Sequence, residues 1–201
     1  PNDKMIVTGS EDHTAKTWDA NTGKILHSFE GHNKSVNTTT WSPDGKMIAT
    51  SSDDKTSKLW DAESFKLNHT FEDYYSVNFA EWSPDGNMIV TASQFASDLT
   101  IWNTSSGELS HELELNHYIG EENGYLIEPG VIFISSAKWS PDGKKIITSC
   151  EDEPARIYEI NNGNQLKGPK DHSDSDKFAA WFPDGKSIVT VGAYDNETKI
   201  W

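Results

Sequence analysis

Tryptophan recurs along this chain at a fixed interval, and that interval limits the folds the chain can adopt. Trp18, Trp60 and Trp102 are separated by 42 residues each. A second series stands directly before a Ser-Pro-Asp-Gly turn or a Phe-Pro-Asp-Gly variant of it: Trp41, Trp82, Trp139 and Trp181. Self-similarity at a period near 42 residues is typical of architectures in which each repeat folds as one supersecondary unit.

The segment 31–61 is the most regular copy of the repeat. It contains three short runs of β-forming residues, at 35–41, 46–52 and 56–61, with turn residues between them, and a fourth run follows at 67–71. Four short strands per unit predict an all-β chain built from four-stranded antiparallel sheets. One such sheet cannot bury both of its faces alone, so we expect the copies to stack.

These features resemble the WD-repeat (WD40) β-propeller family. The motifs that carry the resemblance are Gly31-His32, the Asp-x-Thr turn at 54–56 and the Trp-Asp pairs at 18–19 and 60–61. The resemblance implies a single, partial propeller domain of about five blades, with the first and last incomplete. The predicted blades cover 1–30, 31–72, 73–114, 131–168 and 171–201, and residues 114–130 form an inserted loop between the third and fourth blades.

The family closes its blades into a ring, typically of four to eight blades, and seven are usual. We therefore expect this chain to be a fragment or an incomplete ring. Either further repeats of the same protein or another chain would complete it.

The resemblance also assigns a structural role to polar residues that recur in each repeat. His32, Thr50, Asp54 and Trp60 are expected to form a hydrogen-bonded network, although a hydroxyl, an imidazole and a carboxylate could also suggest a catalytic triad. The corresponding residues of the first and fifth blades are Thr8, Asp12 and Trp18, and His172, Thr190, Asp195 and Trp201. The third blade has Asp73-Tyr74 in place of Gly-His and is expected to lack the network.

Other residue types that could carry chemistry do not form a recognisable site. His27, His69 and His111 recur at 42-residue spacing, and we expect them on exposed edge strands, too far apart to converge on a metal ion. The sequence contains no Gly-rich phosphate loop, Gly-x-Ser-x-Gly motif or paired-His zinc motif. We therefore expect no enzyme activity, no cofactor and no metal, and, from the single Cys150, a cytoplasmic location.

The charge of the chain restricts its partners. Seventeen basic residues against thirty-two acidic ones give a net charge of −15. So acidic a chain repels phosphate backbones, and no apolar run is long enough to cross a membrane. These features predict a protein or peptide partner with basic character, and neither nucleic acid nor membrane.

Aromatic residues in the irregular copies of the repeat indicate a binding surface. In the family, strands a to d run outward from the central channel, and the d–a and b–c loops lie on one face, called the top. Aromatic residues that map to these loops are Tyr74, Tyr75, Phe95, Tyr118, Tyr125 and Tyr194. Exposed aromatic clusters are typical of interaction anchors. For the 114–130 loop, a structural lid over the third blade is an alternative.

We expect a non-catalytic protein–protein interaction scaffold that uses this loop-rich top face. An alternative is a C-terminal sensor or regulatory propeller of a larger multidomain signalling protein. A third interpretation, a propeller hydrolase or a translocation-type propeller, rests on the similarity of 139–147 to repeats of those classes. It has the least support, because the predicted strands a offer Asn37, Asn78 and Glu81 but no convergent set of metal-binding side chains.

Overall fold

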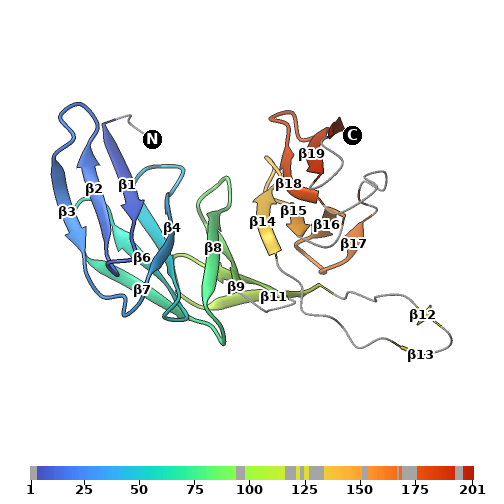
Figure 1. Cartoon of the computed structure of the whole chain (residues 1–201), viewed down its shortest axis with the longest axis horizontal. Helices are drawn as coiled ribbons and strands as arrows, with labels where there is room; N and C mark the ends of the chain where they lie inside the picture. Colours follow the sequence, from blue (N-terminus) through green and yellow to red (C-terminus); the bar gives the residue numbers. More distant parts are fainter. Residues whose placement is uncertain are drawn as a thin grey trace. The chain divides into compact units, whose positions relative to one another are not determined.

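The fold is all-β. The computed structural model describes residues 4–93, 98–115, 121–122, 125–126, 134–150, 154–166, 168, 176–192 and 197–201. These residues form strands and turns, and no helix occurs among them (Figure 1). The predicted all-β class is therefore confirmed.

Five antiparallel sheets follow one another along the chain, and in each of them consecutive strands are neighbours. The first and last sheets have three strands and the other three have four, as expected for incomplete terminal blades. The strands of these sheets are β1 (Met5–Gly9), β2 (Ala15–Asp19), β3 (Ile25–Phe29); β4 (Val36–Trp41), β5 (Met47–Ser52), β6 (Thr56–Asp61), β7 (Leu67–Glu72); β8 (Val77–Trp82), β9 (Met88–Ser93), β10 (Asp98–Asn103), β11 (Leu109–Glu114); β14 (Ile134–Trp139), β15 (Lys145–Cys150), β16 (Arg156–Glu159), β17 (Gln165–Leu166); β18 (Asp176–Trp181), β19 (Ile188–Gly192) and β20 (Thr198–Ile200).

A sixth, two-stranded sheet lies within the inserted loop predicted at 114–130. It pairs β12 (Glu121–Glu122) with β13 (Tyr125–Leu126) in an antiparallel hairpin. The first strand of the fourth large sheet then begins at Ile134.

The chain divides into two compact units. One contains Pro1–Gln94 and Thr100–Ser110, and the other contains Phe95–Leu99 and His111–Trp201. In the first unit, β1 lies beside β4, and β4 lies beside β8, so consecutive sheets are stacked (Figure 1). In the second unit, β14 and β15 both lie beside β18 in the same manner.

The core consists of apolar layers between consecutive sheets. Successive side chains of a strand point to opposite faces of a sheet. Ile48 of β5 therefore packs with Phe29 of the first sheet, whereas its neighbour Ala49 packs with Trp82 of the third sheet. Both β5 residues are fully buried. A middle sheet is thus covered on both faces, which explains why strands such as β5 contain so few charged residues.

The Ser-Pro-Asp-Gly turn forms the same structure each time that it occurs. Ser42 Oγ donates a hydrogen bond to Asp44 Oδ1 at 2.7 Å, and the same oxygen accepts the N–H of Lys46 at 3.0 Å. Gly45 has a φ of 72°, in the left-handed region that glycine favours. Asp85 and Asp142 accept the equivalent bonds in the turns that precede β9 and β15.

A β-bulge recurs near the start of the first strand of the second to fifth large sheets. In β4 the register shifts between Val36 and Thr38, and β8, β14 and β18 shift at the matching position. The bulged residue Asn37 donates from Nδ2 to Asp53 Oδ1 at 2.8 Å and to the carbonyl of Val77 at 3.0 Å. This amide therefore ties the second sheet to the first residue of β8 in the third sheet.

The outward faces of the first and last sheets differ from their counterparts inside the stack. Ile6 pairs with Trp18 in the same register as Ile48 with Trp60, yet Ile6 is 53% exposed and Ile48 is fully buried. In the last sheet, Ile200 pairs with Val189 and is 66% exposed. These two surfaces are called the end faces below, the first defined by Ile6, Thr8 and Trp18 and the second by Phe178, Val189 and Ile200.

Candidate functional site

A buried hydrogen-bond network joins His32 to strand β5 and to the β5–β6 turn of the second sheet. His32 Nε2 lies 2.7 Å from Thr50 Oγ1, and His32 Nδ1 lies 2.9 Å from Asp54 Oδ2. Trp60 Nε1 donates to the same Thr50 hydroxyl at 3.0 Å. One arrangement of protons satisfies all three contacts: His32 is neutral, donates from Nδ1 to Asp54, and accepts the Thr50 hydroxyl proton at Nε2.

Burial sets the electrostatics of this network. Burial lowers the pKa of His32, against the opposing effect of the Asp54 carboxylate, so the ring is held neutral. Burial alone would raise the pKa of Asp54, but hydrogen bonds from Thr56, the Asn33 N–H and His32 outweigh it and lower the pKa to about 2. The carboxylate therefore stays ionised and anchors the turn between β5 and β6.

The hydroxyl, imidazole and carboxylate are arranged like a nucleophile, base and orienting acid, but they are closed to solvent. Thr50 has no exposed surface, and the His32 side chain is only 2% exposed. In this arrangement a substrate has no access to the Thr50 hydroxyl, which already accepts the Trp60 N–H. The geometry fits a clamp that holds the 30–33 connection against the sheet.

Parts of the network recur in the other sheets. The tryptophan-to-threonine bond is present as Trp18–Thr8 at 2.8 Å and as Trp201–Thr190 at 3.0 Å. Asp12 accepts the Thr14 N–H at 3.0 Å and pairs with Lys16 Nζ at 2.6 Å. His172 and Asp195 lie outside the described residues.

The third sheet keeps more of the network than we expected. Trp102 Nε1 donates to Thr91 Oγ1 at 3.1 Å, so the expected loss of the network was wrong for this bond. The two residues are separated by one position more than Trp60 and Thr50, because the third repeat has an extra residue between them. The two side chains nevertheless lie on neighbouring strands, β9 and β10.

The predicted binding surface is visible at one place, the connection from β7 to β8. Residues 73–76, called the tyrosine loop, carry Tyr74, which is 87% exposed, and Tyr75, which is 48% exposed. The Asp73 N–H donates to the Lys55 carbonyl at 2.9 Å, and Ser76 Oγ donates to the Asp53 carbonyl at 3.4 Å. The loop is thus fixed at both of its ends to the β5–β6 turn while its two aromatic rings face solvent.

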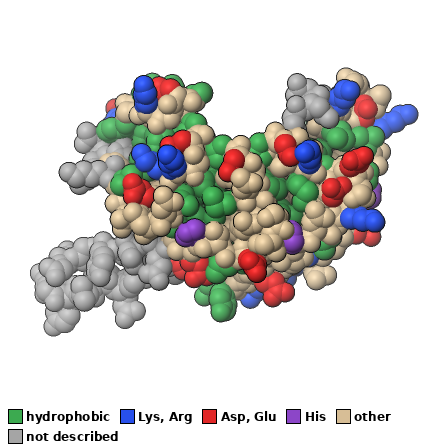
Figure 2. Space-filling view, turned by 180° about the vertical axis from the view of Figure 1, so that it is seen from behind, with side chains coloured by type: hydrophobic (Ala, Val, Ile, Leu, Met, Phe, Trp, Pro, Cys, Tyr) green, Lys and Arg blue, Asp and Glu red, His purple; other side chains and the backbone are tan. Residues whose placement is uncertain are grey.

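Acidic groups surround the tyrosine loop. Glu72 precedes it in sequence, Asp73 is its first residue, and Asp53 lies in the turn that supports it. Over the visible face in Figure 2, acidic side chains are spread out, with basic ones among them, instead of gathering in one patch. The general acidity of the chain therefore does not mark a site, whereas two exposed aromatic rings next to carboxylates do.

The other predicted contact residues are not placed. Phe95, Tyr118 and Tyr194 lie outside the described residues. Tyr125 belongs to β13, where only the backbone is described. Of the predicted surface, the structure therefore describes the side chains of the tyrosine loop.

The recurring histidines are less exposed than we expected. His27 and His69 lie on the edge strands β3 and β7, but both are half-buried, and only His111 is fully exposed. The His27 ring stacks on Phe65 with a centroid distance of 4.3 Å. The expectation of exposed edge positions was wrong for these two because aromatic side chains of the repeat cover them.

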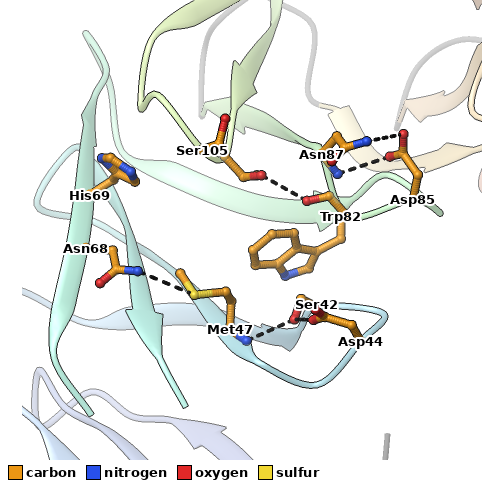
Figure 3. Close-up of a pocket in the computed structure, with 11 residues that line it drawn as sticks. Ser42, Asp44, Met47, Asn68, His69, Trp82, Asp85, Asn87 and Ser105 are labelled. Carbon is orange, nitrogen blue, oxygen red and sulfur yellow. Dashed lines mark hydrogen bonds between the residues drawn. The ribbon is translucent and has the colours of Figure 1, made fainter. Parts of the chain in front are cut away.

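A pocket between the second and third sheets was not predicted from the sequence. It has a volume of about 270 Å³ and lies at the end of β8 opposite to the tyrosine loop (Figure 3). The sequence signal that could have indicated it is Gly107, which stands where the preceding repeat has Phe65.

The described part of the chain offers no group of three or more His, Cys, Asp or Glu side chains placed to hold a metal ion. Cys150 is buried and makes no disulfide. None of the residues that the structure describes forms a helix with the length and apolar character needed to span a bilayer.

Comparisons with known proteins agree with the repeat structure. The family model "WD domain, G-beta repeat" matches residues 1–19, 23–61 and 65–103. Pre-mRNA-processing factor 17 of Saccharomyces cerevisiae is 29% identical over 197 residues, which cover 82% of this chain and 33% of that protein. Shorter matches cover a single repeat.

Two of these shorter matches illustrate their range. The peroxisomal targeting signal 2 receptor of Homo sapiens is 44% identical over 41 residues, or 20% of this chain and 13% of the receptor. Ribosome assembly protein 4 of Saccharomyces cerevisiae is 45% identical over 40 residues, or 20% of this chain and 8% of that protein. The chain spans about a third or less of the length of these relatives.

The matched repeats begin and end within the first three sheets, and the same tryptophan-to-threonine bond recurs in the last sheet, beyond the matched residues. Four-stranded antiparallel sheets stacked face to face are the blade structure that this repeat specifies. On these grounds the chain belongs to the WD40 repeat family.

Proposed function

We propose that this chain is a non-catalytic interaction scaffold that binds a basic protein segment at the tyrosine loop. The family relationship supports protein interaction as the general role. The relatives are named for peroxisomal targeting, ribosome assembly and pre-mRNA processing, which share no single chemistry. What these relatives share with this chain is similarity in the sequence of the repeat.

The single observation that carries the proposal is the exposure of Tyr74 and Tyr75 on a fixed loop. Tyrosine is enriched among residues that dominate binding energy, and a preorganised loop loses little conformational entropy on binding. Here Asp73 and Ser76 are hydrogen-bonded to the β5–β6 turn, so the rings are presented without a folding step.

Charge selects the class of partner. Glu72 and Asp73 directly precede the two tyrosines, and Asp53 belongs to the turn that holds the loop. Aromatic faces attract Lys and Arg cations. A segment that combines basic side chains with an apolar anchor would use both features.

A peptide series tests this proposal. Fluorescently labelled lysine-rich, neutral and acidic peptides of equal length are titrated against the chain, with binding followed by anisotropy. We expect preference for the basic set, and a loss of at least about tenfold in the Tyr74→Ala/Tyr75→Ala variant, because two anchors of more than about 1 kcal/mol each are removed. Unchanged affinity in this variant, or preference for acidic peptides, would contradict the assignment.

A matched control removes apolar surface of comparable exposure elsewhere. Ile25 is 53% and Leu26 is 47% exposed on the edge strand β3. The Ile25→Ala/Leu26→Ala variant should bind the basic peptides as the unmodified chain does.

A second candidate, a regulatory module within a larger protein, is favoured by the two end faces. Equivalent positions are buried in the middle of the stack, so Ile6 and Ile200 have the character of surfaces that another blade covers. We propose that further repeats, of this protein or of another chain, pack on these faces. The interaction role and this one are compatible.

A further inference from the structure

The pocket between the second and third sheets is built from turns and strand ends of both sheets. Figure 3 shows Asn68 and His69 on β7, Met47 at the start of β5, and Trp82 at the end of β8. Asp44 and Asp85 come from the two Ser-Pro-Asp-Gly turns. Trp82 ends β8, whereas the tyrosine loop precedes β8, so about 17–20 Å of strand separates the two sites.

The corresponding junction between the first and second sheets explains why the pocket is open. There Phe65 stacks on His27 at a centroid distance of 4.3 Å and lies edge-on to Phe29 at 5.9 Å. The equivalent of His27 in the next repeat is His69, and the equivalent of Phe65 is Gly107. Gly107 therefore offers no ring that could stack on His69 as Phe65 stacks on His27, and the His69 ring instead contacts Phe71 of its own strand at a centroid distance of 6.4 Å.

Gly107 keeps the turn geometry while removing the side chain. Its φ is 75°, and Phe65 has a φ of 60°, so the two backbones have the same left-handed conformation. A Cβ added at Gly107 would lie 2.5 Å from His69 Nδ1. The glycine thus lets the His69 ring occupy a place from which a larger residue would displace it.

The size and lining of the pocket define the ligand class. About 270 Å³ is below the roughly 300–1,000 Å³ typical of pockets for small-molecule ligands, which suits a single side chain. The aromatic and thioether groups of Trp82, His69 and Met47 supply flat apolar contacts, while polar groups from both turns surround them. Neither Lys nor Arg is among the described residues that line it.

Two carboxylates give the pocket a negative rim. The Lys46 N–H and the Ser42 hydroxyl lower the pKa of Asp44, and the hydroxyl of Ser83 and the Asn87 N–H lower the pKa of Asp85. Both groups are consequently ionised at neutral pH. Lys46 approaches Asp44 at 3.5 Å in an exposed pair, which a ligand can displace at small cost.

We propose that this pocket binds an arginine side chain of a partner protein, as a second interaction site separate from the tyrosine loop. A guanidinium group is planar and stacks on aromatic rings, and its N–H groups pair with carboxylates. Arginine therefore uses the ring faces and the acidic rim together. A phenylalanine side chain, which fills the equivalent junction from Phe65, would bring no positive charge to the two carboxylates.

Peptides of matched shape test the ligand class. Acetyl-Ala-Ala-Arg-Ala-Ala-amide is titrated into the ¹⁵N-labelled chain, alongside peptides with citrulline or phenylalanine at the central position. Citrulline has the shape of arginine without its charge. We expect saturable shifts at Trp82 Nε1–H and the Asn68 and Ser105 amides with the arginine peptide, and at least about fivefold weaker binding of the other two.

Variants locate the site. Asp44→Asn/Asp85→Asn keeps an oxygen acceptor in each turn but removes the charge, and should weaken binding of the arginine peptide at least about fivefold. Asp142→Asn is the matched control, because Asp142 accepts the same turn hydrogen bonds outside the pocket. It should change the affinity less than about twofold.

Gly107→Phe should close the pocket as Phe65 closes the other junction and abolish binding. Gly23→Phe is its control, since Gly23 has the same positive φ with open space around its Cβ position. If Gly107→Phe does not fold, the Asp44→Asn/Asp85→Asn variant alone decides whether the peptide binds in this pocket.

Four results would overturn the proposal. Equal binding of the arginine and citrulline peptides would exclude charge recognition, and tighter binding of the phenylalanine peptide would make the pocket an aromatic site. Loss of binding in Tyr74→Ala/Tyr75→Ala with retention in the aspartate variant would place the peptide at the tyrosine loop. The absence of saturable shifts at millimolar peptide would overturn it as well. None of these results contradicts the proposed function at the tyrosine loop, and the third, which places the peptide there, would support it.

Discussion

At the scale of single residues, the same chemical groups serve different ends according to burial. His32, Thr50 and Asp54 have the order of contacts of a nucleophile, a base and an orienting acid, but they are sealed inside the repeat. Buried polar groups stabilise a structure only when each has a partner, and loss of one partner leaves the others unsatisfied. We therefore assign this network to stability.

Removal of the Asp54 carboxylate tests that assignment. Asp54→Ala leaves the His32 ring and the Asn33 N–H without their acceptor, so we expect a loss of about 1–3 kcal/mol in the free energy of unfolding, measured with urea. Asp12→Ala is the control, because Asp12 occupies the same turn position on an exposed surface. An equal effect of both substitutions would contradict a special role for the buried network.

The pKa values predict how stability depends on pH. The pKa of His32 is lowered in the folded state, so the unfolded chain binds more protons below about pH 6.5 and stability falls as the pH decreases. The pKa of Asp54 is also lowered, to about 2, which adds a further loss below about pH 4. Urea unfolding of His32→Gln should show a flatter profile between pH 7 and 5. A profile unchanged by this substitution would show that His32 does not carry the dependence.

At the scale of elements, the turn between the third and fourth strands of a repeat differs between the junction of the first and second sheets and the junction of the second and third sheets. Its left-handed position is glycine at Gly23, Gly107 and Gly163 but phenylalanine at Phe65. A non-glycine residue there is strained by about 1–2 kcal/mol. The stacking of Phe65 on His27 and its contact with Phe29 offset that strain.

This balance predicts an unusual order of stabilities. Phe65→Ala keeps the strained backbone and loses the aromatic contacts, so it should be the less stable variant. Phe65→Gly loses the same contacts but relieves the strain, and should be more stable than Phe65→Ala by about 1 kcal/mol. Thermal unfolding of the two variants measures the difference. The reverse order would show that the backbone at residue 65 is not strained.

The sequence predicts the elements better than it predicts these contacts. Tryptophan spacing and the Ser-Pro-Asp-Gly turns determine where strands begin, because turn chemistry is local to a few residues. The Trp102–Thr91 bond was not predicted, because an inserted residue between the two suggested a broken network, whereas the hydrogen bond is present. The pocket at His69 was not predicted either, because it depends on packing between two sheets, where one missing side chain at Gly107 changes the surface.

At the scale of the whole molecule, the first and the last sheet each carry the same kind of exposed apolar surface. Ile6 is 53% exposed and Ile200 is 66% exposed, while Ile48 and Leu59, at the equivalent positions of the second sheet, are fully buried. Apolar surface of this kind marks an interface or an aggregation liability. The proposed packing of further blades on the end faces accounts for it.

The end faces predict self-association of the isolated chain. Sedimentation velocity should show concentration-dependent association, and Ile6→Glu/Ile200→Glu should reduce it by placing charges on both faces. Ile25→Glu is the matched control, because Ile25 is also 53% exposed but lies on the edge strand β3. Equal effects of the two variants would indicate general surface hydrophobicity, without a special role for the end faces.

The central claim is that this scaffold binds a basic segment at the tyrosine loop, and amide hydrogen exchange tests it without altering the protein. The chain is compared alone and with the tightest-binding lysine-rich peptide of the series. We predict slower exchange at residues 73–76 and in the supporting turn at 53–55, with the remaining described strands unchanged. Protection confined to other loops, with none at residues 73–76, would contradict the claim.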